Sequence, residues 1–261
     1  MFSYPFMQNA YLVGTLIAIV AGIVGVFIVA RSMSFLAHTL SEIGFAGASF
    51  GLFMGWNPLL GMLIFTILAS TTIGQLGMNE NRSESLISSV SAVAIGLGIA
   101  FLALSQKNAS AATGILFGSI FSISLVNIYE VVGLALLVLI VVMVLFRQLR
   151  HFAFDYSTAV FSLKNVTLIE VAFLVIMATT VAVSAQVVGS LLIFILMTLP
   201  ASAAMRWGRT VWQMMGLAVL FALIGIWSAL ALSYWTNVPV SFYIAIIEAG
   251  IYFLSLVKTQ K

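Results

Sequence analysis

The stretch SFLAHTLSEIGFAGASFGLF, residues 34–53, is long enough to cross a membrane as a helix, yet it carries two ionisable side chains, His38 and Glu42. A membrane-spanning helix needs about 20 consecutive, mostly apolar residues. Ionisable groups inside a bilayer are costly and usually mark an ion or proton pathway. Because the two residues are four apart, a helix brings both to one face, as a two-ligand metal site or a proton relay requires.

Polar and small residues fall on opposite sides of this expected helix. A helix advances about 100° per residue, so Glu42 lies about 40° from His38. Three serines share this side: Ser34, Ser41 and Ser49. Three glycines lie roughly opposite: Gly47, Gly51 and Gly55. Such a ladder of small residues lets helices approach closely, so we expect one packing face and one polar face that meets a cavity or another polar surface.

The composition of the chain is that of a membrane protein. Of the 261 residues, 63% are hydrophobic and 7% are charged, and the mean hydropathy is +1.22. Apolar runs of about 20 residues recur along the chain, and no polar stretch is long enough for a soluble domain. We therefore expect residues 1–261 to form a single all-α, polytopic membrane domain. The absence of cysteine excludes disulfides and thiolate metal sites.

We expect nine membrane-spanning helices, or eight if two adjoining segments form one span. The two places where adjoining segments could form one span lie at Gly55–Pro58 and near Gln186–Gly189. The expected spans are 9–31, 34–56, 58–76, 86–105, 128–149, 167–184, 187–205, 210–233 and 240–257.

The basic residues predict the orientation of these spans. With nine spans and the N-terminus outside, only Lys107 of the ten Lys and Arg residues falls outside the cytoplasm. The net charge of +3 therefore indicates topology and not nucleic-acid binding. The first 30 residues hold no basic residue, so the charged start of a signal peptide is missing and the first span is expected to be retained.

Two connections carry structure of their own in this interpretation. The apolar stretch Gly114–Ile123 is too short to span and predicts a re-entrant or surface helix on the outside. The segment His151–Asn165 is internal and amphipathic, and it is well placed to contact a cytoplasmic partner.

Residues 30–55, ARSMSFLAHTLSEIGFAGASFGLFMG, resemble the segment after the first span of ABC-type metal-ion permeases, the membrane subunits of bacterial manganese, zinc and iron importers. Members commonly carry a basic residue, then Met-Ser, an acidic residue, a Ser-His pair four residues on, and glycines. His38 takes the acidic position and Glu42 the histidine position, so the order of the two ligand types is exchanged. The other matching residues are Arg31, Met33, Ser34, Ser41 and Gly47.

Three further segments are similar to the same family in order and spacing. They are ILFGSIFSIS (115–124), FAFDYSTAVF (152–161) and VGSLLIFILMTLPASAA (188–204). The second resembles the segment that couples the permease to its ATPase, which implies coupling roles for Asp155, Ala159 and Phe161. The family pattern has a glycine near the end of this segment, and this chain lacks it.

The resemblance implies a permease subunit in the cytoplasmic membrane of a bacterium. A homodimer of permeases would sit on two ATPase subunits and receive its ion from an extracytoplasmic metal-binding protein. His38 and Glu42 of both copies would form a transient site for zinc or manganese, with no permanently bound cofactor. Independently of the resemblance, Glu248 in the middle of the last expected span is a third candidate ligand, or else a buried packing residue. The chain has no Gly-x-x-x-x-Gly-Lys-Ser/Thr motif, so it is not expected to be an enzyme, and ATP hydrolysis must come from another chain.

Other interpretations of these residues remain open at this stage. Glu42 and Glu248 could act as a proton-coupled pair in a secondary transporter. His38 could instead be hydrogen-bonded to a neighbour near the membrane boundary, while Glu42 balances a basic group such as Arg31. Glu130, near an external span end, could help to attract cations. An intramembrane metalloenzyme is disfavoured, because the chain has two histidines and no His-Glu-x-x-His motif.

Overall fold

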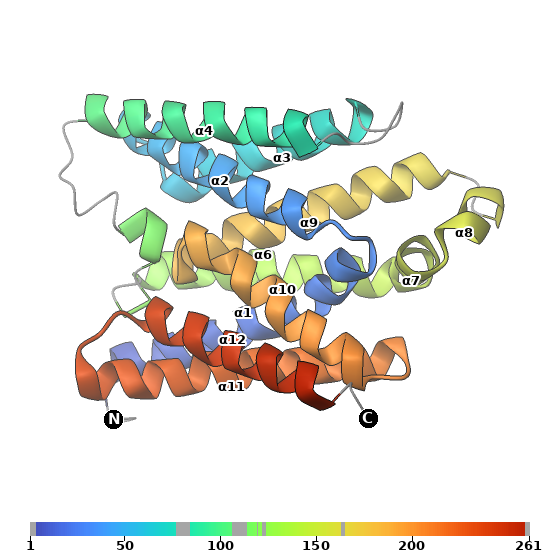
Figure 1. The fold of residues 1–261 in the computed structure, drawn as a ribbon. Coiled ribbons are helices and arrows are strands. Elements are labelled where there is room, and N and C mark those ends of the chain that lie inside the picture. The colour runs from blue at the N-terminus through green and yellow to red at the C-terminus, as the bar shows by residue number, and fades with distance from the viewer. Residues whose placement is uncertain are drawn as a thin grey trace.

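The computed structural model describes residues 4–76, 84–105, 114–118, 120–121, 124–162 and 165–258. No strand occurs among these residues, so the predicted all-α class is confirmed. The principal helices, labelled in Figure 1, are α1 (Pro5–Ala30), α2 (Ser34–Met54), α3 (Pro58–Leu76), α4 (Glu84–Leu104), α6 (Leu125–Val144), α7 (Phe146–Phe154), α8 (Tyr156–Ser162), α9 (Val166–Val188), α10 (Ser190–Trp207), α11 (Val211–Thr236) and α12 (Val240–Lys258).

Each of the nine expected spans overlaps one long helix of the described chain. Seven of these helices are apolar enough over 18 or more residues to cross a membrane. The helix α2 is outside this set, since His38, Glu42 and its serines and glycines lower its hydropathy. The helix α3 counts only as a shorter apolar helix, over Pro58–Ile73. A multi-span protein is therefore supported, while the count of nine spans stays a prediction.

The expected break between the second and third spans is present in the structure. The helix α2 ends at Met54, and Gly55 follows in the left-handed region with φ 74°. This conformation is the common way to end a helix, and glycine adopts it without strain. Pro58 then begins α3, where its fixed φ is favourable and its missing N–H costs no helical hydrogen bond.

The break between α9 and α10 is also present, at Gly189 with φ 101°. Gly189 lies against Gly118, which has φ 78°. A Cβ atom added at Gly118 would lie 2.4 Å from the carbonyl oxygen of Val187. The described part of the segment 114–121 therefore rests on this helix break. Beside it lies a cavity of about 720 Å³, whose lining also includes the start of α12.

The end of the fifth expected span differs from the structure. We expected this span to reach residue 149, but α6 ends at Val144, and α7 follows after Leu145 as a separate helix. The residues of α7 are amphipathic: Leu149 and Phe152 are buried, while Arg147 and Arg150 are exposed. The amphipathic segment therefore begins at residue 146 and comprises α7 and α8, whereas we expected it over residues 151–165.

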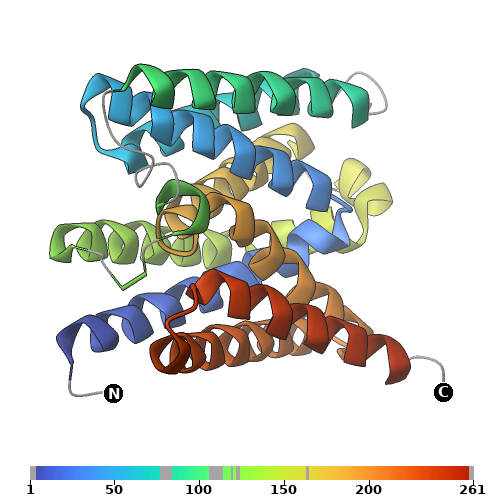
Figure 2. The ribbon, with the colours of Figure 1, turned by 60° about the vertical axis from the view of Figure 1, so that its left-hand side comes forward.

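The long helices run roughly side by side in three layers (Figures 1 and 2). The helices α2, α3 and α4 form one outer layer, and α11 and α12 form the other. The helix α1 runs through the interior, and α10 contacts both α2 and α12. The labelled chain ends lie at opposite ends of the bundle in Figure 1, with α7 and α8 at the end of the C-terminus.

Candidate metal-ion site and coupling segment

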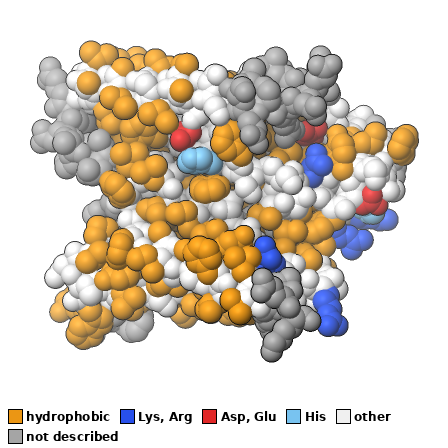
Figure 3. All heavy atoms as spheres, viewed as in Figure 1, with side chains coloured by type: hydrophobic (Ala, Val, Ile, Leu, Met, Phe, Trp, Pro, Cys, Tyr) orange, Lys and Arg blue, Asp and Glu red, His pale blue; other side chains and the backbone are white. Residues whose placement is uncertain are grey.

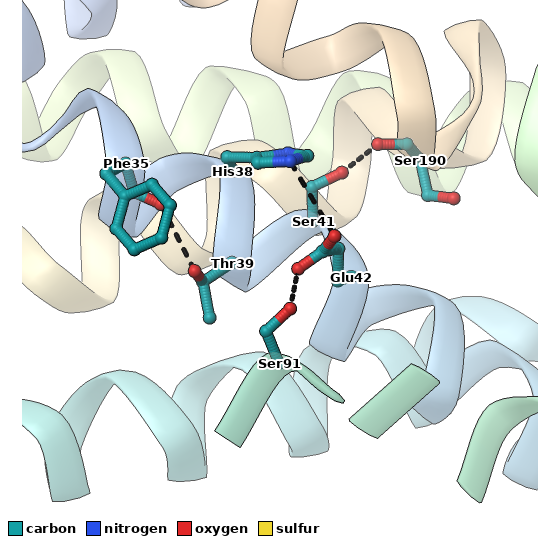
Figure 4. Close-up of polar contacts among 7 residues, drawn as sticks. All are labelled: Phe35, His38, Thr39, Ser41, Glu42, Ser91 and Ser190. Atoms are coloured by element: carbon teal, nitrogen blue, oxygen red, sulfur yellow. Dashed lines mark hydrogen bonds and ion pairs between the residues drawn. The ribbon is translucent and has the colours of Figure 1, made fainter. Parts of the chain in front are cut away.

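The helix α2 brings His38 and Glu42 together, as their spacing predicts. His38 Nε2 lies 3.6 Å from Glu42 Oε1. The His38 side chain is 36% exposed and the Glu42 side chain 18%, so both are reachable from outside this copy of the chain. Figure 4 shows the imidazole and the carboxylate side by side on one face of the helix. In Figure 3, a histidine and an acidic side chain reach the surface among hydrophobic and uncharged groups.

Polar groups of α4 and α10 meet the same face of α2 (Figure 4). The hydroxyl of Ser91 on α4 donates a hydrogen bond to Glu42 Oε2. The hydroxyl of Ser41 donates to the backbone carbonyl of Ser190 on α10. These bonds confirm that the polar face of α2 meets other polar groups, and the bond from Ser91 holds the Glu42 carboxylate in place.

The imidazole of His38 is held by packing and not by a hydrogen bond on its inner side. Its ring centroid lies 4.9 Å from that of Phe194 on α10. Its Nδ1 atom is buried and has no hydrogen-bond partner in the described part of the chain. The Nε2 edge is the one directed at Glu42. An ion bound at this face would therefore meet Nε2 of His38 together with an oxygen of Glu42.

Two ligands do not complete a metal site. Zinc in proteins is typically bound by four ligands, and manganese takes more oxygen. Within the described residues, no group of three or more His, Cys, Asp or Glu side chains is gathered. A full coordination shell at this face therefore needs ligands from outside one copy of the chain, or water.

The opposite face of α2 packs closely on the start of α3 at Gly47 and Gly51, as predicted, whereas Gly55, the third glycine of the expected ladder, ends the helix and has nothing within 4 Å of an added Cβ atom. A Cβ atom added at Gly47 would lie 2.3 Å from the carbonyl oxygen of Gly61. One added at Gly61 would lie 2.0 Å from the carbonyl oxygen of Gly47. The two backbones can approach this closely only because neither residue has a side chain. This contact fixes α2 so that His38 and Glu42 face away from α3.

Glu248 lies apart from the pair. It is fully buried on α12, and neither carboxylate oxygen has a hydrogen-bond partner in the described part of the chain. Its side chain packs against Gly225 of α11, where a Cβ atom would be 2.0 Å from Glu248 Oε1. Glu130 is also separate, since both of its carboxylate oxygens accept from Asn57 Nδ2, at 3.1 and 2.9 Å.

The segment expected to couple to an ATPase exposes two of its three predicted residues. The Asp155 carboxylate caps α8, because its Oδ1 accepts from the backbone N–H of Thr158 at 3.2 Å and from the hydroxyl of Ser157 at 3.1 Å. Hydrogen bonds from Thr158 and then from Ser157 hold the pKa of Asp155 below its usual value. Phe161 is 91% exposed, whereas Ala159 is buried.

Sequence reasoning missed the surroundings of Arg31. Its guanidinium lies over two aromatic rings of the coupling segment, 4.5 Å from the centroid of Phe152 and 4.1 Å from that of Tyr156. The sequence contains the aromatic residues, but nothing in their spacing indicates that they meet a residue 121 and 125 positions earlier.

The family model of the ABC 3 transport family matches residues 3–259. This chain belongs to that family. Among the relatives, the manganese import system permease protein ScaB of Streptococcus pneumoniae is 30% identical over 271 residues, covering 99% of this chain and 92% of its own length. The high-affinity zinc uptake system membrane protein ZnuB of Haemophilus influenzae is 25% identical over 261 residues, covering 99% of both chains.

A solved structure has the same fold. It is PsaBC from Streptococcus pneumoniae in complex with Fab, with a TM-score of 0.88 and 24% identity, and the match covers 97% of this chain and 91% of the other. Membership of the ABC 3 transport family confirms the resemblance seen in residues 30–55 and the permease architecture. The relatives are permease and membrane proteins of import systems, which confirms that this chain is a transport subunit and not an enzyme.

Proposed function

We propose that this chain is the permease subunit of an ATP-driven importer of a divalent transition metal ion, namely zinc, manganese or iron. One observation carries the proposal: an imidazole and a carboxylate lie 3.6 Å apart on an accessible face of α2, a helix that packs against candidate membrane spans. Ionisable groups within a membrane are retained chiefly for ion pathways. The names of the manganese and zinc relatives support the choice of cargo.

The proposed site is shared by two copies of the chain. One copy presents only His38 and Glu42, with no third ligand of the usual types gathered in its described part. Two copies facing each other through α2 would supply two imidazoles and two carboxylates, enough for a four-coordinate ion. No metal would be held permanently, because an importer must bind its ion weakly enough to release it.

The coupling segment and the chain orientation complete the proposal. The chain would form a single membrane domain, with its N-terminus outside and its C-terminus in the cytoplasm of a bacterium. Lys and Arg side chains visible in Figure 3 gather toward the end that holds α7 and α8 in Figure 1, as a cytoplasmic end would have them. Exposed Phe161 and the α8 cap at Asp155 would contact a separate ATPase, and an extracytoplasmic metal-binding protein would deliver the ion to the opposite end.

Transport would follow from a rocking motion of the two permeases. ATP binding and hydrolysis at the ATPases would move α7 and α8, and the membrane helices would alternate between outward- and inward-open arrangements. His38 and Glu42 of both copies would hold the ion between these states. No nucleic acid takes part in this scheme.

Reconstitution tests this function directly. The permease, its ATPase and its metal-binding protein are placed in proteoliposomes, and uptake of radioactive zinc, manganese and iron is measured with and without ATP. We expect ATP-dependent uptake of at least one of these ions. Uptake driven by a proton gradient without the ATPase would contradict the proposal and support a secondary transporter.

Glu248→Gln is expected to leave metal uptake within about twofold of the parent protein. The amide has nearly the shape of the carboxylic acid, and the buried group lies apart from the His38–Glu42 pair. A proton-coupled mechanism would require a titratable group at this position. Loss of uptake in a Glu248→Gln protein that still folds and hydrolyses ATP would give Glu248 a direct part in transport.

A further inference from the structure

Arg31 joins the coupling segment to the helix that carries the proposed ion site. It lies directly between α1 and α2, three residues before α2 begins. Its guanidinium lies over the ring of Phe152 on α7 and over that of Tyr156 on α8. A guanidinium within about 6 Å of a ring centroid is attracted by the ring, more strongly where water is excluded. One side chain therefore bridges both helices of the coupling segment.

The last turn of α1 makes a second contact with the same segment. The ring centroid of Phe27 lies 6.2 Å from that of Phe146 and 6.5 Å from that of Phe154, both on α7. Phe27 and Arg31 are four residues apart and so lie on one side of the helix end. Phe27 therefore packs the end of α1 against α7, and Arg31 adds a contact between the end of α1 and α8.

The turn between Arg31 and α2 is short and fully hydrogen-bonded. The N–H of Ser32 donates to Val29 at 3.0 Å, and the N–H of Met33 donates to Ile28 at 2.9 Å. With Ser32 in the left-handed region at φ 54°, these two bonds form the Schellman ending of a helix. A turn of this kind has little freedom, so a displacement of Arg31 is passed to the first turn of α2.

The two rings beside Arg31 differ in their burial and in the helix to which they belong. Phe152 is fully buried and packs on Phe173 of α9, with ring centroids 5.9 Å apart. Tyr156 is 40% exposed and belongs to α8, the helix that also presents Phe161 to solvent. The Phe152 ring thus packs on a membrane helix, while the Tyr156 ring lies on the exposed helix α8. A movement of α8 relative to α9 would shift the Tyr156 ring beneath the guanidinium between α1 and α2.

We propose that Arg31 is a positioning residue that transmits movement of the coupling segment α7–α8 to α2, and thereby to His38 and Glu42. This inference rests on the proposed function, since it assigns an ATPase contact to α7–α8. It goes beyond that function in naming the side chain through which the coupling segment reaches the ion site.

The experiment uses the complete complex in proteoliposomes and two readouts. The first is the number of metal ions taken up per ATP hydrolysed. The second is an ATP-dependent change in the spectrum of a spin label on Phe35→Cys, an exposed position on α2. The chain has no cysteine of its own, so this label is the only one on the permease. The test variants are Arg31→Ala and Arg31→Lys. The control is Arg209→Ala, which removes the same charge at an exposed position.

Arg31→Ala is expected to lower the ions transported per ATP by roughly 10- to 30-fold, because the ring contacts are lost. ATP hydrolysis continues, while the label no longer responds to ATP. Arg31→Lys should restore part of both readouts, since an ammonium group still attracts the rings but lacks the flat stacking surface. Arg209→Ala should match the parent protein in both.

Three results would overturn the role of Arg31. One is an unchanged ratio of ions to ATP in Arg31→Ala. Another is a parallel loss of hydrolysis and uptake that Arg31→Lys does not relieve, which indicates a purely structural residue. The third is a label on α2 that never responds to ATP in the parent protein. Failure of the proposed function itself is distinguished by a parent complex whose label responds to ATP but which takes up no metal.

Discussion

Exchanging the two proposed ligands, as His38→Glu with Glu42→His, is expected to retain metal uptake, whereas His38→Ala or Glu42→Ala alone should lower it about 100-fold or more. In a site shared by two copies, each alanine variant removes two of the four protein ligands. Changes to groups that merely support metal ligands already cost roughly 10- to 100-fold in affinity. The exchanged protein keeps both ligand types on one helix face, because positions 38 and 42 are about 40° apart.

The surroundings of the two positions indicate that the exchange is tolerated. In the parent protein, the Ser91 hydroxyl donates a hydrogen bond to the Glu42 carboxylate. The same hydroxyl can form a hydrogen bond with an imidazole at position 42. Position 38 is 36% exposed in one copy of the chain, so a carboxylate side chain can be accommodated there. Metal uptake by the exchanged protein is expected to be slower than by the parent protein, because the exchange removes the ring at position 38 that packs against Phe194. The preferred metal is expected to be kept, because the set of donor atoms is the same.

Uptake of radioactive zinc and manganese, measured in proteoliposomes with the ATPase, checks this expectation. The control is Ser49→Ala, which lies on the same face but whose hydroxyl bonds within its own helix to the carbonyl of Phe45, at 2.8 Å. This control should transport normally. If His38→Ala and Glu42→Ala transport as well as the control, the pair is not the ion site.

The parts of this site that could be predicted from the sequence are those set by local geometry. A helix with 3.6 residues per turn fixes the relation of His38 to Glu42 and of both to Gly47, whatever the tertiary structure. The helix breaks at Gly55 and Gly189 were likewise predictable, because glycine ends helices. The span count was less secure, since the polar residues of α2 reduce the hydropathy signal on which such a count depends.

The parts that could not be predicted depend on contacts between distant residues. Ser91 and Ser190 meet α2 only because α4 and α10 pack beside it. The rings under Arg31 likewise lie far from it in the chain, so no periodicity reveals them. The end of α6 at Val144 was misplaced because the chain passes from α6 through Leu145 into α7 without a glycine or proline that would mark the break.

Gly47→Val is expected to be the most damaging single apolar substitution on α2, lowering the free energy of unfolding by more than about 3 kcal/mol. Forcing extra carbon atoms into a packed interior typically costs about 1–3 kcal/mol. Here the first added atom alone would lie 2.3 Å from the carbonyl oxygen of Gly61 and 2.8 Å from its carbonyl carbon. These are backbone atoms, which cannot rotate away, so α2 and α3 must separate. Gly47→Ala should show a smaller loss, of about 1–3 kcal/mol.

Unfolding of the purified protein in detergent, followed by circular dichroism, measures these differences. The matched control is Gly133→Ala on α6, where an added Cβ atom meets nothing within 4 Å. This control should gain about 0.5–1 kcal/mol, because alanine favours a helix over glycine. Equal stability of Gly47→Val and the parent protein would mean that α2 and α3 do not depend on this close approach. A strong loss at Gly47 together with a gain at Gly133 would show that Gly47 acts through close packing of α2 on α3, and that this contact fixes the face of α2 opposite the ion site.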